Sequence, residues 1–186
     1  IKKIGRNHFL NPDEFISKLK KKQLKKTDLC LTFDDALKSQ IKIVLPILDK
    51  LNIRAFFFIY TEIYEKKNTN LMELTRDFIQ TKFLNFDEFF DFFLENLKKY
   101  KNPNKINYFF KKNNLKIKKM KITYNFYSLK EIKYRLIRDN FFKIKSFNSF
   151  MLQLFKKRNY QVDKRYKEIF MSKKDIINLV KKGHVI

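Results

Sequence analysis

The run Leu29-Cys30-Leu31-Thr32-Phe33-Asp34-Asp35 is an apolar segment that ends on two adjacent carboxylates. Its alternation of apolar and small residues predicts a β-strand. In parallel α/β folds, ligands and metals bind at the carboxyl ends of the strands. The sequence therefore predicts that Asp34 and Asp35 lie at the rim of an active site.

A helix and a second strand are predicted to follow the acidic pair. Arg54–Ile59 has the composition of a strand. The apolar residues between the two predicted strands recur at helical spacing, at Ile41, Val44, Leu45, Leu48 and Leu51. Because a strand–helix–strand unit places its two strands in parallel, the fold class predicted here is α/β.

The chain of 186 residues is 44% hydrophobic, which is enough for one domain or for part of a larger one. No apolar run approaches the roughly 20 residues that span a bilayer, so no transmembrane segment is predicted. The sequence starts at Ile1 and stops at Ile186, just after a predicted helix end. We therefore expect a fragment, and leave its location open between the cytoplasm and the cell envelope.

The formal charge of +24 suggests nucleic acid or another anionic partner. However, Lys, Asn, Ile, Phe and Tyr are abundant while Gly, Pro and Trp are scarce, which is typical of an A- and T-rich coding sequence. Such a bias raises the lysine content without any ligand, so nucleic acid is a disfavoured partner. The single cysteine, Cys30, permits no internal disulfide and is predicted to be a small buried hydrophobe.

Several segments carry signals for the ends of helices. Asn11–Glu14 combines a capping Asn, a Pro and two acids, and predicts a helix start. Ser128–Glu131 and Ser172–Asp175 have the pattern of capping boxes. Gly183 suits the position after a helix end, and His184–Ile186 is then predicted to begin a new strand.

The stretch from Glu62 to Phe170 shows helical stripes and basic loops, with Phe141–Phe155 predicted as one helix. One stripe of apolar residues, interpreted as the core of a helical subdomain, comprises Phe83, Phe86, Phe90, Phe93 and Leu97. The alternative is a basic helical module in which Lys98–Lys130 binds nucleic acid or an acidic polymer.

The residues alone leave three interpretations of the acidic pair open. In the first, one carboxylate binds a divalent metal and the other acts as a general base. In the second, the acids handle phosphate, although such sites usually space their acids as Asp-x-Asp. In the third, Asp35 or a neighbour caps the next helix.

The segment Thr32-Phe33-Asp34-Asp35-Ala36 resembles the first motif, Thr-Phe-Asp-Asp-Gly, of the polysaccharide deacetylase family (the NodB-homology domain), and matches it at four of five places. Leu45–Leu48 and Ala55–Phe58 are similar to the helix and strand that follow this motif. Met171–Ile186 looks like the entry to the second motif of the family.

The resemblance implies a partial, distorted (β/α) barrel that carries a mainly α-helical insertion. Residues 1–61 would form the N-terminal part of the barrel, with the Asp-Asp motif. Residues 62–170 would be the insertion. Residues 171–186 would return to the barrel and stop before the histidine motif.

The resemblance also implies a metal-dependent hydrolase that removes acetyl groups from the N-acetylated sugars of a polysaccharide. Asp34 would be the general base, and Asp35 a ligand to a divalent metal, zinc or cobalt. Further histidine ligands would lie beyond Ile186, so the chain alone is expected to be inactive. His8 and His184 are not expected to be ligands.

One departure from the family pattern bears on this assignment. Ala36 stands where the motif has glycine, so the loop is strained if the position needs a positive φ. A deacetylase-like protein that binds a glycan without turnover is therefore kept as an alternative.

Overall fold

The computed structural model describes residues 1, 3–64 and 71–186. The chain divides into two compact units. The first, called here the sheet unit, consists of Ile1–Asn68 and Asp163–Ile186. The second, called the helical unit, consists of Thr69–Val162. Among the residues described, no helix is long and apolar enough to cross a membrane.

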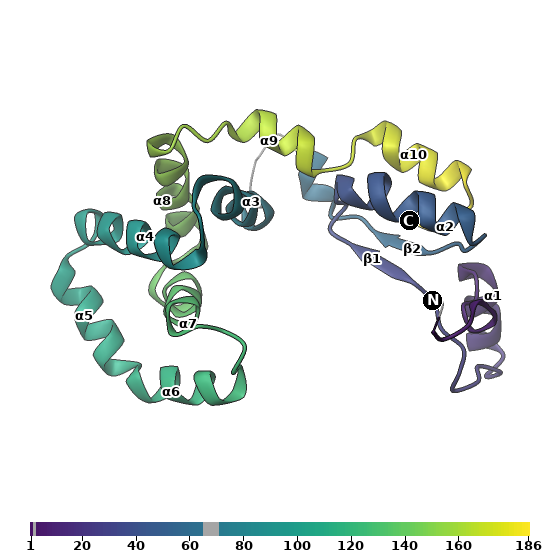
Figure 1. Ribbon diagram of the computed structural model, residues 1–186, viewed down its shortest axis with the longest axis horizontal. Helices are drawn as coiled ribbons and strands as arrows, with labels where there is room; N and C mark the ends of the chain where they lie inside the picture. The colour runs from purple at the N-terminus through teal and green to yellow at the C-terminus, as the bar shows by residue number, and fades with distance from the viewer. Residues whose placement is uncertain (2, 65–70) are drawn as a thin grey trace. The chain divides into compact units, whose positions relative to one another are not determined.

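Helices predominate in both units (Figure 1). The sheet unit contains η1 (Arg6–His8), α1 (Pro12–Lys20), β1 (Thr32–Asp34), η2 (Gln40–Val44), α2 (Leu45–Lys50), β2 (Phe56–Phe58), η3 (Thr61–Tyr64) and α10 (Lys173–Lys181). The helical unit contains α3 (Met72–Lys82), α4 (Phe86–Tyr100), α5 (Pro103–Lys112), α6 (Asn114–Thr123), α7 (Leu129–Leu136), η4 (Ile137–Phe141) and α8 (Ile144–Lys157). The division between the units falls at the start of α9 (Val162–Ile169).

The two strands of the sheet unit pair in parallel, with Phe33 opposite Phe57, as the strand–helix–strand pattern predicts. The last residues of the chain extend this pairing, because the N–H of Phe57 donates to the carbonyl of Val185 at 2.8 Å. Val185 forms a single parallel bridge with Phe56 of β2, where a new strand was predicted to begin at His184–Ile186. The small parallel sheet lies beneath α2 and α10 in Figure 1.

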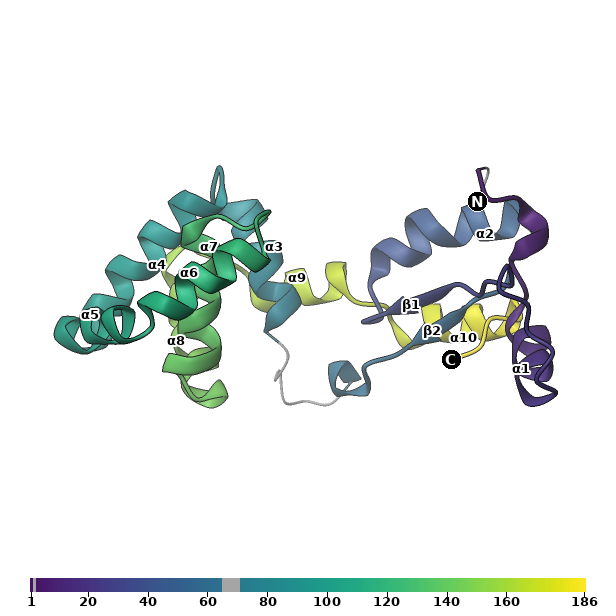
Figure 2. The same ribbon diagram turned by 90° about the horizontal axis from the view of Figure 1, so that it is seen from below.

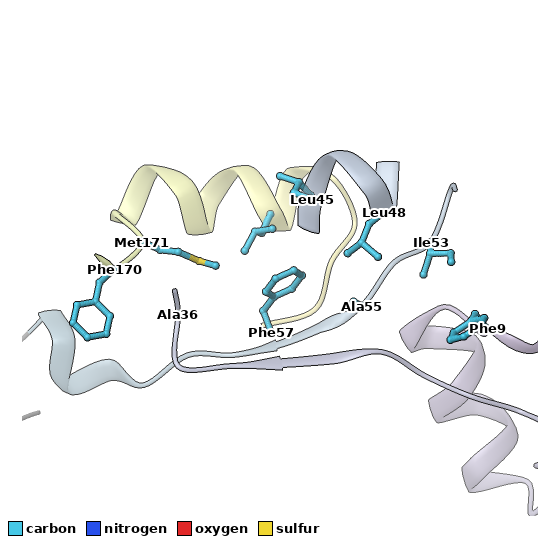
Figure 3. Close-up of a cluster of buried hydrophobic side chains, with 10 residues drawn as sticks. Phe9, Ala36, Leu45, Leu48, Ile53, Ala55, Phe57, Phe170 and Met171 are labelled. Atoms are coloured by element: carbon cyan, nitrogen blue, oxygen red, sulfur yellow. The ribbon is translucent and has the colours of Figure 1, made fainter. Parts of the chain in front are cut away.

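The core of the sheet unit lies between the sheet and its helices. The Phe57 side chain is fully buried and points from β2 toward α2 and α10 (Figure 3), and the ring of Phe33 stacks on it with centroids 5.0 Å apart. Alternate residues point to the opposite face of a strand, so Asp34 and Phe58 lie on the other face. Phe58 is 55% exposed, so that face is open among the residues described.

A buried histidine fastens the end of the chain to the sheet. The backbone N–H of Ala55 donates to Nδ1 of His184 at 3.1 Å, and the His184 ring meets Phe57 edge-on at 5.2 Å. Because Nδ1 accepts a hydrogen bond, the proton of the neutral ring is assigned to Nε2. The contact places His184 in a structural role.

The burial of His184 predicts a pH-dependent stability. Burial, and next the nearby charge of Arg54, lower the pKa of His184 below its ordinary value of 6.5. Since the unfolded chain then binds the proton more readily than the folded one, stability is complete above about pH 6.5 and falls as the pH decreases below it. We expect His184→Asn, which keeps an acceptor for Ala55, to weaken this loss between about pH 7 and pH 5, as measured by urea titrations. An unchanged pH dependence in the variant would contradict the assignment.

The predicted helix ends are largely confirmed. Ser128 and Ser172 both form complete capping boxes, and Gly183 has a φ of 81° just beyond α10. Asn11 precedes α1 as predicted, but its side chain does not cap the helix. Its Oδ1 instead accepts a hydrogen bond from the N–H of Arg54 at 2.9 Å, which ties the start of α1 to the segment that enters β2.

The helical unit packs around aromatic side chains, so the core interpretation of the stripe is confirmed for its buried members. The buried apolar residues of α4 are Phe89, Phe90, Phe93 and Leu97. Of the predicted stripe, Phe83, Phe90, Phe93 and Leu97 are buried and Phe86 is half-buried. Phe83 lies just before α4 rather than in it, and the buried Phe89 was not predicted. The helix predicted from Phe141 begins at Ile144, because Phe141 belongs to η4.

Candidate active site

The acidic pair lies at the carboxyl end of β1, in a sharp turn of the backbone. Asp34 is the last residue of the strand, and both carboxylate residues are exposed. Asp35 and Ala36 have φ values of 70° and 51°. These values lie in the left-handed region that glycine prefers, so Ala36 occupies the conformation that the glycine of the motif would adopt without strain.

Residues that follow the helical unit in sequence hold this turn in place. The N–H of Met171 donates to the carbonyl of Ala36 at 2.8 Å, and Leu37 bridges Phe170 in an antiparallel pair. On the other side of the pair, the Gln40 side-chain amide donates to the carbonyl of Asp34 at 2.6 Å. The backbone of the turn is thus fixed while the two carboxylates face solvent.

Substitutions at Ala36 measure how tightly the turn is constrained. The Ala36 side chain is 1% exposed, so Ala36→Val adds volume to a filled core and puts a β-branched residue at a positive φ. We expect Ala36→Val to lower the free energy of unfolding by about 2–4 kcal/mol. Ala36→Gly relieves strain but loses a buried methyl, so a change below about 1 kcal/mol is expected in the same urea titration. Equal effects of the two variants would contradict this account of the turn.

The two carboxylates have no protein partner among the residues described: no ion pair or hydrogen bond involves either side chain. Lys38 and Ser39 already have a helical backbone and lead into η2 (Gln40–Val44), and among the residues described no backbone N–H of this segment donates to the Asp35 carboxylate. The described structure therefore gives no support to the capping interpretation of Asp35. Both side chains remain available to a ligand or to water.

The carboxyl end of β2 contributes further polar groups to the same edge of the sheet, because parallel strands end together. There the Tyr60 hydroxyl donates to the Glu62 carboxylate. Tyr64 donates to the carbonyl of Met171 at 2.9 Å, and burial raises its pKa to about 12, so it stays protonated. Tyr60, Glu62 and Tyr64 were not among the predicted site residues. Their position just after the second predicted strand was the available signal.

The residues described do not by themselves fit a complete catalytic zinc site. No group of three His, Cys, Asp or Glu side chains able to hold a metal ion occurs among them, whereas catalytic zinc has three protein ligands. Cys30 is half-buried rather than fully buried, and burial raises the pKa of its thiol, which disfavours the thiolate needed for metal binding. Asp34 and Asp35 could supply at most part of a ligand set.

Comparison with known proteins bears directly on this turn. Neither a curated protein nor a solved structure matches the chain. A family model matches part of the chain but does not reach the segment Met171–Ile186, whose likeness to the second motif stays a prediction. The matched region contains β1, the acidic turn and β2. Residues 21–82 match the model of the polysaccharide deacetylase family, which confirms the resemblance carried by the Thr32–Ala36 motif.

Proposed function

We propose that this chain is part of a hydrolase that removes acetyl groups from the N-acetylated sugars of a polysaccharide. The observation that carries the proposal is the exposed Asp34–Asp35 pair, which lies at the end of a parallel strand inside the region matched by the deacetylase family. We also propose that residues 62–170 are a helical insertion in a (β/α) barrel to which residues 1–61 and 171–186 belong.

In this proposal, Asp34 is the general base. Its carboxylate accepts a proton from water as the water oxygen bonds to the acetyl carbonyl carbon, which is the usual role of a positioned acid–base group. The bond between that carbon and the sugar nitrogen then breaks as the nitrogen takes up a proton, which gives acetate and a free amine. The open face of the sheet next to Asp34 leaves room for a sugar to approach.

Asp35 is proposed as a carboxylate ligand to a divalent metal, zinc or cobalt. Because the residues described hold no group of three ligands, we expect the 186-residue chain to bind zinc only weakly and to be inactive alone. Isothermal titration calorimetry of the chain with zinc tests this expectation. Stoichiometric binding with a micromolar dissociation constant would contradict it.

The function itself is tested by acetate release from an N-acetylglucosamine oligomer, with and without a chelator, using the natural full-length protein. Acetate release that the chelator stops and zinc restores supports the proposal. Release that persists in the double variant Asp34→Asn, Asp35→Asn would overturn it. A deacetylase-like protein without turnover would instead bind the oligomer and release no acetate.

A further inference from the structure

Helix α6 carries apolar residues on two opposite faces. On one face Ile117 is buried, in a cluster with Ile132 and Leu136 from α7. On the other, Leu115 and Ile122 lie two helical turns apart and are 74% and 82% exposed. A helix of a globular protein usually has one apolar stripe, which faces the core. The second stripe therefore needs another explanation, because exposed apolar groups that gather on one surface mark interaction sites.

Lysines flank the exposed stripe. Lys118 and Lys119 lie between Leu115 and Ile122 on the same side of the helix, since residues three and four apart are neighbours on a helix surface. Both are exposed, and neither forms an ion pair among the residues described. These four residues are called here the α6 face. The sequence has no acid between Glu95 and Glu131, so the face is uniformly positive.

An ordered aromatic segment follows the end of helix α6. The Lys121 ammonium group donates to the carbonyls of Asn125 and Tyr127 at 2.9 and 2.6 Å. The Arg135 guanidinium lies 4.0 Å from the centre of the Tyr127 ring. These contacts fix the backbone around Phe126, whose ring is 70% exposed. The Phe126 ring packs on the ring of Tyr127, with centroids 4.4 Å apart, and most of its surface faces solvent.

We propose that the α6 face, together with Phe126, binds the surface of an anionic lipid bilayer. Leu115, Ile122 and Phe126 would enter the boundary between headgroups and acyl chains, as the apolar side of an interfacial helix does. The stems of Lys118 and Lys119 would lie along this boundary while their ammonium groups reach the anionic headgroups. The proposal does not depend on the deacetylase assignment.

The composition of the face favours a bilayer over other anionic partners. A single-stranded nucleic acid is bound by stacking of bases on aromatic rings along a basic groove, which gives no role to exposed Leu115 and Ile122. A protein partner needs a surface that fits a convex helix closely. A fluid bilayer accepts a convex apolar stripe without such a fit.

Sedimentation with vesicles tests the proposal on the natural full-length protein. The vesicles contain phosphatidylcholine and phosphatidylglycerol in equal amounts, or phosphatidylcholine alone. We expect binding only to the anionic vesicles. One double variant combines Leu115→Gln with Ile122→Gln, and the other combines Lys118→Glu with Lys119→Glu. Each is expected to weaken binding at least about tenfold. Phe126→Ser, outside any helix, is expected to weaken binding without altering helix propensity.

Matched variants serve as controls. Leu84→Gln with Ile144→Gln removes two exposed apolar side chains of the same unit, 94% and 70% exposed, and is expected to change binding by less than about twofold. Lys173→Glu with Lys174→Glu reverses two exposed charges on α10 and is expected to change binding far less than the reversal at the α6 face. Equal binding to neutral vesicles would overturn the proposal. A charge effect without any effect of the apolar variants would also overturn it and would indicate a soluble polyanion instead.

Discussion

Replacing Asp34 by Asn is expected to lower the rate of acetate release by about 100- to 10,000-fold, which is the range that a positioned acid–base group contributes. Asn has nearly the same shape but cannot take a proton from water. The Asp34 side chain is exposed and has no protein partner among the residues described, so its replacement removes no stabilising contact. The melting temperature should therefore stay close to that of the wild type. Acetate release and thermal unfolding are both measured on the natural full-length protein.

Two matched variants make this result specific. Asp13→Asn replaces another exposed acid of the sheet unit, in the first turn of α1, and should leave the rate unchanged. Asp35→Asn keeps a residue type that tolerates a positive φ, so it tests the second carboxylate without straining the turn. A rate within tenfold of the wild type in Asp34→Asn would rule out the role of general base. Equal losses in Asp13→Asn would show that the assay reports charge rather than catalysis.

The local architecture around the acidic pair could be predicted because its signals are local. Strand composition, helical spacing and capping residues each act over a few neighbouring positions, so β1, α2, β2 and the start of α10 were found from sequence. The support of the turn could not be found in this way. The hydrogen bond from Met171 to Ala36 joins one residue that precedes the helical unit in sequence to one that follows it, and no local signal reports such a contact.

The burial of Phe89 in α4, which the predicted stripe did not include, shows the same limit of local signals. Helical spacing finds an apolar face, but with phenylalanine at five positions between Phe86 and Phe93 several rotations satisfy it equally well. The choice depends on tertiary partners. Phe89 and Phe93 both pack against Tyr134 of α7, with ring centroids 5.3 and 5.1 Å apart. Phe86 also meets the Tyr134 ring, at 5.6 Å, and yet stays half-buried, so helical spacing alone does not separate it from the fully buried Phe89.

Prediction of the candidate site from sequence is limited in the same way. The motif predicted that Asp34 and Asp35 end a strand, and the structure agrees. Whether a carboxylate at a strand end is exposed or paired depends on what packs beside it, which sequence spacing does not report. The positive φ at Ala36 was expected only through the glycine of the family motif, because alanine itself carries no signal for that conformation.

Phe57→Ala is expected to lower the stability of the sheet unit by about 3–5 kcal/mol, the usual effect of truncating a fully buried phenylalanine. The ring is 0% exposed and points from β2 toward α2 and α10 (Figure 3), the two helices that run alongside the strands in Figure 2. Its loss leaves a cavity and removes the contacts with Phe33 and His184. Since whole domains are stable by only about 5–15 kcal/mol, this is a large share of the total.

Phe58→Ala provides the control, because Phe58 is the next residue of β2 but lies on the open face and is 55% exposed. Its truncation is expected to change stability by less than about 1 kcal/mol. Amide hydrogen exchange, followed by mass spectrometry on peptides that contain β2, reports the stability of this unit separately from the helical one. If the two variants lost protection equally, the assignment of Phe57 to the covered face and of Asp34 to the open one would be wrong. The same comparison therefore tests whether Asp34 faces the side of the sheet on which a glycan could bind.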